Sequence, residues 1–213
     1  MTLDPEAIGW AGLAASAAIV AAYELRVRRV GGREPARIGR FAHARIRAEW
    51  ARALAEAPGT EILAVQTLRN ALMSSTISAS TAALALMGAA SLLGGAVLHG
   101  ELGAGLPTVR GTIVGLLLAS LFASFVTAAM AVRLYNHAGF MTSLPAGSAQ
   151  RREFTPLAVD YLQRAGHFHS WSLRTFFLVA PLAVGLLSPP WMPLAALGLV
   201  VALAAFDRVP RTE

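Results

Sequence analysis

Residues 175–206 read TFFLVAPLAVGLLSPPWMPLAALGLVVALAAF and contain no Asp, Glu, Lys or Arg. One helix of this length would measure about 48 Å, whereas the hydrocarbon core of a bilayer is about 30 Å thick. Ser188-Pro189-Pro190 interrupts the stretch, and proline both lacks a backbone donor and disfavours helix in the residue before it. The stretch therefore predicts two membrane spans joined by a tight turn.

Three further uncharged stretches lie upstream, over 8–23, 71–100 and 111–132. Together the stretches predict an all-α polytopic membrane helix bundle with five transmembrane helices, forming a single integral membrane domain over 1–213. We expect spans at about 8–25, 62–98, 111–139, 168–188 and 191–207. The composition agrees, since 55% of residues are hydrophobic, 14% are charged and the mean hydropathy is +0.56, against about 25% charged residues in soluble domains.

All 18 basic residues are arginines, and most belong to one side of the predicted bundle. Five crossings place fourteen of them together, within 26–52, 151–164 and 208–211, whereas Arg110 falls on the other side. The positive-inside rule then predicts an outside N-terminus and a cytoplasmic C-terminus. The membrane that we expect is the bacterial inner membrane. Asp4 and Glu6 precede the first stretch, which does not fit the positive n-region of a cleaved signal peptide.

The same observations argue against several function classes. The formal net charge is +6, but the arginines follow the membrane topology instead of forming a patch with stacking aromatics, so nucleic-acid binding is not expected. The lack of cysteine excludes disulfides, thiolate metal sites and Cys nucleophiles. The sequence has no paired-carboxylate site, phosphate-binding glycine loop or nucleophile elbow, so we expect neither an enzyme nor a cofactor.

A cytoplasmic amphipathic helix is predicted over about 35–57, with Pro35 at its first position and Pro58-Gly59 after its end. One face would carry Ile38, Ala42, Ile46, Trp50, Ala53, Leu54 and Ala57, and the opposite half Arg37, Arg40, Arg47 and Arg52. Two placements fit this pattern: the membrane interface, or the cytoplasmic ends of the bundle. A second, short helix is expected from Thr155-Pro156, with Asp160 and Arg164 spaced to pair.

The candidate binding site is a set of polar residues near the cytoplasmic ends of the spans: Arg69, Asn70, Arg133, Asn136, His137 and Arg174. Arg174 is 15 residues before Pro189, about 22 Å along a helix, and a charge at that depth usually faces the bundle interior or a cavity. Arginines and helix N-termini favour anions, so the set predicts a site for a small anion, phosphate headgroup or carboxylate. The alternative is arginines that extend to the interface, or that pair internally with Glu61 or Asp160.

Two other patterns have ordinary structural explanations beside functional ones. Small and hydroxyl residues recur at helical spacing in the second and third spans, which fits either an ion pathway or close helix packing, and packing is favoured. His167 and His169 could ligate a metal or haem together with His137 or His43. Residues two apart diverge by about 200° on a helix, and no acidic cluster joins these histidines, so no metal site is predicted.

Several motifs resemble a known family. Leu63-Ala-Val-Gln-Thr-Leu-Arg-Asn-Ala-Leu-Met-Ser-Ser-Thr76 with Ser80-Thr81, then Arg133-Leu-Tyr-Asn-His137, and finally His169-Ser-Trp-Ser-Leu-Arg-Thr-Phe-Phe177 are similar to segments of the domain-of-unknown-function-599 membrane proteins of bacteria and plants. Arg47-Ala-Glu-Trp50 resembles a bacterial element of that family. The resemblance implies an integral membrane protein and supplies no activity. It includes Arg69, Asn70, Arg133, Asn136 and Arg174.

The leading hypothesis is a small transporter, channel or lipid- or anion-binding membrane protein with a cytoplasm-facing Arg/Asn/His site. Its expected partners are membrane lipids, a small anion or phosphate headgroup, and a second copy of the chain. The runner-up is a non-transporting scaffold, accessory subunit or assembly factor, whose small-residue faces would contact partner helices. A haem- or metal-binding membrane protein comes third.

Overall fold

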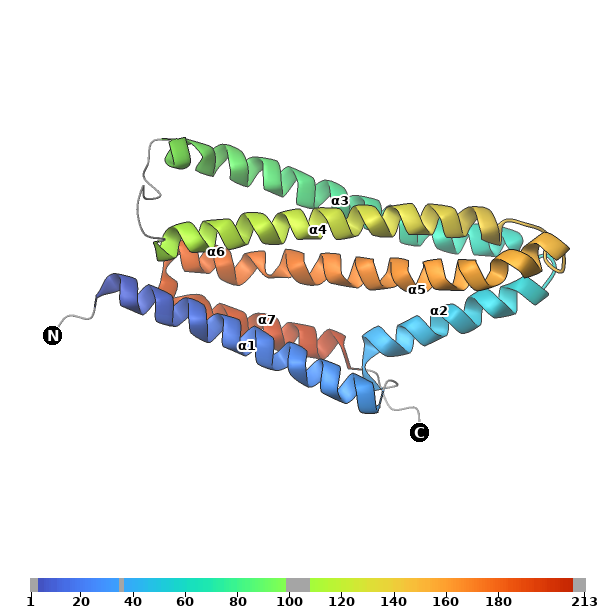
Figure 1. Ribbon diagram of the computed structural model, residues 1–213, viewed down its shortest axis with the longest axis horizontal. Helices are drawn as coiled ribbons and strands as arrows, with labels where there is room; N and C mark the ends of the chain where they lie inside the picture. The colour runs from blue at the N-terminus through green and yellow to red at the C-terminus, as the bar shows by residue number, and fades with distance from the viewer. Residues whose placement is uncertain (1–3, 35–36, 99–107, 209–213) are drawn as a thin grey trace.

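The computed structural model describes residues 4–34, 37–98 and 108–208, and it is built from helices (Figure 1). In chain order these are α1 (Pro5–Arg33), α2 (Gly39–Glu56), α3 (Glu61–Leu98), α4 (Val109–Thr142), α5 (Ala149–Phe177), α6 (Val179–Leu187), the 3-10 turn η2 (Pro189–Trp191) and α7 (Met192–Phe206). The described residues contain no strand, only an isolated bridge between Ile38 and Arg208. The predicted all-α fold class is therefore confirmed.

Among the described residues, five helical segments are long and apolar enough to cross a membrane, which confirms the predicted number. They cover Pro5–Arg33, Glu61–Leu92, Val109–Thr142, Ala149–Leu187 and Pro189–Phe206. The turn expected at Ser188-Pro189-Pro190 is η2, where Ser188 ends α6 with an extended backbone (φ −157°, ψ 97°). The prolines thus divide the long apolar stretch at the expected place.

The fourth span differs from expectation because α5 is continuous from Ala149, which precedes both the short helix expected from Thr155-Pro156 and the span expected from about 168. Ser148 provides the cap, since its hydroxyl accepts a hydrogen bond from Arg151 N at 3.1 Å. Pro156 lies inside the helix and does not end it. The expected short helix is therefore the first part of the fourth span, and the predicted pair of Arg164 and Asp160 forms on it at 3.5 Å.

The antiparallel pair α4 and α5 forms the centre of the bundle, with α3 packed on α4 and α1 packed on α7 (Figure 1). At one end Ile113, Leu121 and Leu182 form a buried cluster. In the middle, Ser124 Oγ donates to Ser172 O at 2.9 Å, and Ser172 Oγ donates back to Ser124 O at 3.0 Å. This hydroxyl exchange is helix packing of the kind favoured for the small-residue faces.

Helix α2 packs on the outside of α5 (Figure 1), the second of the two placements considered. It begins at Gly39, later than expected, and Pro35 lies outside the described residues. Its buried face includes Ala48, Ala51 and Leu54, whereas Ile46 is 62% exposed. The predicted apolar face is therefore correct only in part: its Leu54 is buried, but Ile46 is not, and the contact also uses Ala48 and Ala51, because alanines let two helix backbones approach closely.

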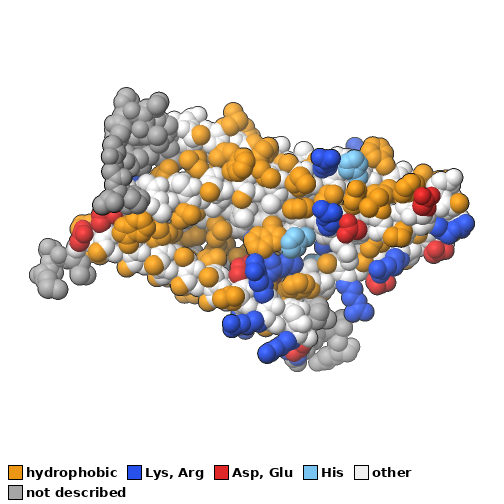
Figure 2. Space-filling view, viewed as in Figure 1, with side chains coloured by type: hydrophobic (Ala, Val, Ile, Leu, Met, Phe, Trp, Pro, Cys, Tyr) orange, Lys and Arg blue, Asp and Glu red, His pale blue; other side chains and the backbone are white. Residues whose placement is uncertain are grey.

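The charged side chains gather toward the end of the bundle that carries α2, here called the α2 end. The visible face in Figure 2 is mostly hydrophobic over its other half, while Arg, Asp, Glu and His side chains are concentrated toward the α2 end. The α4–α5 turn and the C-terminal end of α7 belong to the same end (Figure 1). A bilayer would therefore cover the half that is poor in charge.

Candidate functional site

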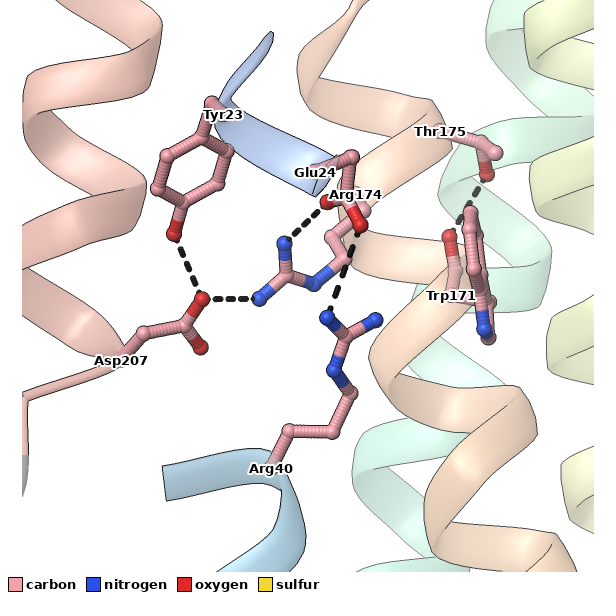
Figure 3. A network of polar contacts seen from close by, with 7 residues as sticks. All are labelled: Tyr23, Glu24, Arg40, Trp171, Arg174, Thr175 and Asp207. Carbon is pink, nitrogen blue, oxygen red and sulfur yellow. Dashed lines mark hydrogen bonds and ion pairs between the residues drawn. The ribbon is translucent and has the colours of Figure 1, made fainter. Parts of the chain in front are cut away.

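Arg174 lies at the level where α1, α5 and α7 come together, and two acidic residues surround it (Figure 3). Its Nη1 donates to Glu24 Oε1 at 2.7 Å, and its Nη2 donates to Asp207 Oδ2 at 2.5 Å. The Arg174 side chain is only 9% exposed. A buried guanidinium is tolerated when carboxylates compensate it at this distance, so the charge of Arg174 is balanced inside the protein.

Two more side chains complete what we call the Arg174 network, which comprises Arg174, Glu24, Asp207, Tyr23 and Arg40. The hydroxyl of Tyr23 donates to Asp207 Oδ2 at 2.6 Å, and Arg40 Nη2 lies 3.5 Å from Glu24 Oε2 (Figure 3). Gly39 N also donates to Asp207 O at 2.9 Å. The network therefore joins α1, α2, α5 and the end of α7.

The network corrects the internal partners considered for Arg174. Glu61 instead accepts a hydrogen bond from Ala146 N at 3.0 Å, which holds the α4–α5 turn. Asp160 pairs with Arg164 on its own helix. The true partners follow from topology: Glu24 and Asp207 each come directly after an uncharged stretch that ends at the α2 end, at about the depth of Arg174.

The other predicted site residues lie apart from the Arg174 network. Arg69 and Asn70 on α3 are exposed, as are Arg133, Asn136 and His137 on α4. The ring of His137 makes an edge contact with Tyr161, with centroids 6.1 Å apart. The structure does not bring this set together with Arg174, and anion binding by these five residues stays a prediction.

A cavity of about 750 Å³ lies at the α2 end, between α2, α5 and the end of α7. We call it the α2 cavity. Its charged lining consists of Arg40, Arg47, Arg164, Arg174, Asp160 and Asp207. Its lining also includes His43, His167, His169, Phe41, Phe168, Phe177, Leu203 and Phe206. The cavity thus combines cationic and aromatic groups.

Arg47 is one of the cations that line the cavity, and its guanidinium packs against a glycine. The guanidinium lies directly over Gly166 of α5, so that a Cβ at position 166 would overlap its Cζ, Nη2 and Nε atoms. Arg47 is half-buried, and its Nε is fully buried. Burial lowers the pKa of the Arg47 guanidinium, because it removes the charged form from water. An arginine nevertheless remains protonated at neutral pH.

Arg47 differs from the other arginines of the cavity in having no acidic partner. Arg40 is paired with Glu24, Arg164 with Asp160, and Arg174 with Glu24 and Asp207. Within the described residues, the Arg47 guanidinium forms neither a hydrogen bond nor an ion pair, and its Nε atom is buried without a partner. Counting only acidic residues that the structure describes, the cavity therefore contains one positive charge without a counter-charge.

The histidines are spread over separate contacts. His169 Nδ1 is 3.2 Å from Ser75 Oγ of α3, and the His167 ring makes an edge contact with Trp171 at 6.2 Å. Among the residues that the structure describes, no group of three His, Asp or Glu side chains could hold a metal ion. The imidazoles and the arginines can donate hydrogen bonds, which suits an anionic ligand better than a cation.

Sequence reasoning missed Arg40, Arg47 and Gly166 as site residues. It placed both arginines on the solvent side of α2, and the structure contradicts that placement, since the Arg40 side chain is only 8% exposed. Gly166 offered the one available indication, because a glycine inside a helix often allows close approach of another group. The group that approaches Gly166 is the Arg47 guanidinium, and its position depends on how α2 packs on α5. No local sequence pattern determines that packing.

Comparison of the sequence with known protein families gives a match over nearly the whole chain. The family described as "Protein of unknown function, DUF599" matches residues 11–212. The chain belongs to this family. Neither the curated proteins nor the solved structures contain a match. DUF599 membership confirms the resemblance found in the sequence and leaves the activity to be inferred from the site.

Proposed function

We propose that this DUF599 protein is a multi-pass protein of the bacterial inner membrane, with the α2 end in the cytoplasm. The arginines support this orientation, since the α2 end carries residues 26–52 and 151–164 together with Arg208, and the described part of these segments contains thirteen of the 18 basic residues. Loops rich in arginine remain on the cytoplasmic side during insertion. The N-terminus would then lie outside and the residues after α7 in the cytoplasm.

Its molecular function, on this proposal, is to bind an anion in the α2 cavity. The observation that carries the proposal is Arg47, whose guanidinium has no partner among the described residues and whose Nε is buried. A half-buried cation without a counter-charge is destabilising, and a bound anion would offset that cost. Arginine binds phosphate and carboxylate oxygens through paired, charge-assisted hydrogen bonds, which makes a ligand with such a group the best fit.

Of the leading functions, a lipid- or anion-binding membrane protein is the one that this cavity supports best. A transporter or channel needs a route from one side of the membrane to the other. The residues that line the α2 cavity all belong to α2, α5 and the end of α7 near the α2 end. Transport would require a further opening toward η2, so binding is the function proposed here.

The test compares two arginines of the same helix. Arg47→Gln removes the cation of the cavity, whereas Arg45→Gln removes an equal charge from an exposed position two residues away. The purified variants are titrated with inorganic phosphate, sn-glycerol 3-phosphate and anionic phospholipid, and the thermal midpoint is recorded. Loss of charge-assisted hydrogen bonds worth about 1.5–3 kcal/mol should weaken binding of at least one probe tenfold or more in Arg47→Gln alone. Equal responses of both variants to every probe would contradict the proposal.

A second candidate function is the scaffold or accessory subunit, and the surface of α3 favours it. Helix α3 packs mainly on α4, and Ile77, Leu84 and Met87 are each at least 64% exposed. In a membrane this face contacts either lipid or the helix of another protein. Light scattering on the protein in mild detergent measures the mass of the complex: a monomer would count against the scaffold, and an assembly weakened by Leu84→Ser would support it.

A further inference from the structure

The α2 cavity is open at a definite depth in the membrane, and this depth indicates what kind of anion reaches it. If Pro189 marks the opposite boundary of the hydrocarbon core, Gly166 lies 23 residues before it, about 34 Å along α5 and α6. The core is about 30 Å thick, and each headgroup layer adds about 5–7 Å. Arg47, seated over Gly166, therefore lies at the level of the lipid phosphates.

Two of the phenylalanines that line the cavity, Phe177 and Phe206, lie on the membrane side of this cation. Phe177 is 12 residues before Pro189, about 18 Å along the same helices, and therefore well inside the core. Phe206 directly precedes Asp207 where α7 leaves the membrane, and it is 75% exposed. Phe177 is also exposed, at 38%. The cavity thus has a cationic part at headgroup depth and an apolar part at acyl-chain depth.

The charge of the cavity further restricts the ligand. Arg40, Arg164 and Arg174 each have an acidic partner, so within the described part of the chain one positive charge of the cavity, that of Arg47, has none. A phosphodiester carries a single negative charge, whereas a phosphate monoester carries about −1.5 to −2 at pH 7. One uncompensated arginine therefore matches a phosphodiester better than a monoester.

We propose that the α2 cavity binds one anionic phospholipid of the adjacent leaflet, with its phosphodiester on Arg47 and an acyl chain along Phe177 and Phe206. This inference rests on the proposed anion-binding function and specifies the class of ligand. Gly166 positions the guanidinium, and α2 covers the headgroup from the side of the aqueous phase. The lipid enters sideways from the bilayer, with its headgroup staying in the headgroup layer.

The experiment uses the full chain, stripped of lipid in detergent, and measures binding by native mass spectrometry and isothermal titration. The probes are palmitoyl-oleoyl phosphatidylglycerol, the zwitterionic phosphatidylcholine with the same chains, and glycerophosphoglycerol, which is the same phosphodiester without acyl chains. We expect one phosphatidylglycerol per chain, bound at least tenfold more tightly than phosphatidylcholine and at least a hundredfold more tightly than glycerophosphoglycerol.

Four variants test whether the cationic part of the cavity binds the phosphodiester and the apolar part binds the acyl chain. Arg47→Gln and Gly166→Ala should each weaken phosphatidylglycerol binding at least tenfold, while Arg45→Gln changes it less than twofold. Phe206→Ser, at an exposed position where folding does not depend on burial, should weaken binding of the lipid and leave that of glycerophosphoglycerol unchanged. A thermal midpoint within a few degrees of the wild type confirms that each variant is folded.

Each outcome decides between the inference and the function on which it rests. If glycerophosphoglycerol or inorganic phosphate binds as tightly as the lipid and its binding depends on Arg47, the assignment of a lipid ligand is overturned. The proposed anion-binding function is then supported. If phosphatidylglycerol binds equally to wild type and Arg47→Gln, its binding is that of any surface lipid and the inference is overturned. If no probe depends on Arg47, both the inference and the proposed function are overturned.

Discussion

At the scale of single residues, Arg174 and Arg47 show two ways in which this protein holds an arginine near the membrane. Arg174 is enclosed by Glu24 and Asp207, which accept from different nitrogens of its guanidinium. Arg47 has a glycine beneath it and no acidic neighbour within the described residues. Removing one partner of a buried ion pair destabilises a protein, whereas removing a charge that has no partner does not leave another charge unpaired. Substitution of Arg174 should therefore lower the stability more than substitution of Arg47.

Replacement of Arg174 tests its structural role. Arg174→Met leaves Asp207 and Glu24 with less positive charge in a mostly buried setting, and removal of one partner of a buried pair costs about 3–5 kcal/mol. We expect the thermal midpoint in detergent to fall strongly. The triple variant Glu24→Gln, Asp207→Asn, Arg174→Met removes the charges together and should recover much of the loss. Arg69→Gln, at an exposed position, serves as control and should change stability by less than about 0.5 kcal/mol.

At the scale of helices, α1 depends on glycines for its closest contacts. A Cβ at Gly12 would lie 2.6 Å from the backbone oxygen of Pro189, in the turn that joins α6 and α7. A Cβ at Gly9 would meet the side chain of Val109 at the start of α4. The packing of α1 against η2 and against the start of α4 therefore requires the absence of a side chain at these two positions.

Two glycine substitutions distinguish this packing from helix propensity. Gly12→Ala pushes α1 away from a backbone atom that cannot rotate aside, and overpacking of this kind costs about 1–3 kcal/mol. Gly115→Ala lies in α4 with no atom within 4 Å of the new Cβ, so it should be neutral or stabilise by up to about 1 kcal/mol. Thermal unfolding of the two variants measures the difference, and equal midpoints would show that the contact does not contribute.

The elements were largely predictable from the sequence, and the contacts between them were not. Uncharged stretches and the prolines at 189 and 190 determine the spans, because each acts within one segment. The face of α2 was misjudged because a helical projection weights large apolar residues such as Ile46, whereas the contact with α5 uses Ala48 and Ala51. The partners of Arg174 lie 150 and 33 residues away in the chain, and no local pattern links them.

At the scale of the whole molecule, the arrangement of charge separates the protein into two parts. The half toward η2 is mostly apolar on its visible surface, whereas the half with α2 carries most of the charged side chains (Figure 2). Helices α4 and α5 extend beyond α1 and α7 at this end (Figure 1) and support α2. On the proposed orientation, this extension lies in the cytoplasm.

The proposed orientation can be measured directly, because the chain contains no cysteine and each variant then has a single thiol. We expect Asp4→Cys to react with a membrane-impermeant maleimide on intact spheroplasts. Arg45→Cys should react only after the membrane is permeabilised. Both positions are exposed, so accessibility to the reagent depends on the membrane alone. Reaction of Arg45→Cys before permeabilisation would reverse the orientation.

The Arg174 network has a consequence for the order of biogenesis. Glu24 and Arg40 are 16 residues apart and can meet as soon as α2 has been synthesised. Arg174 is added only after three spans have entered the membrane, and Asp207 follows all the helices described here. Glu24 therefore has a provisional partner in Arg40 during insertion and acquires Arg174 later. The Arg174 network is complete only when α7 has been inserted and has docked against α1, so it forms as the last step among the helices described here.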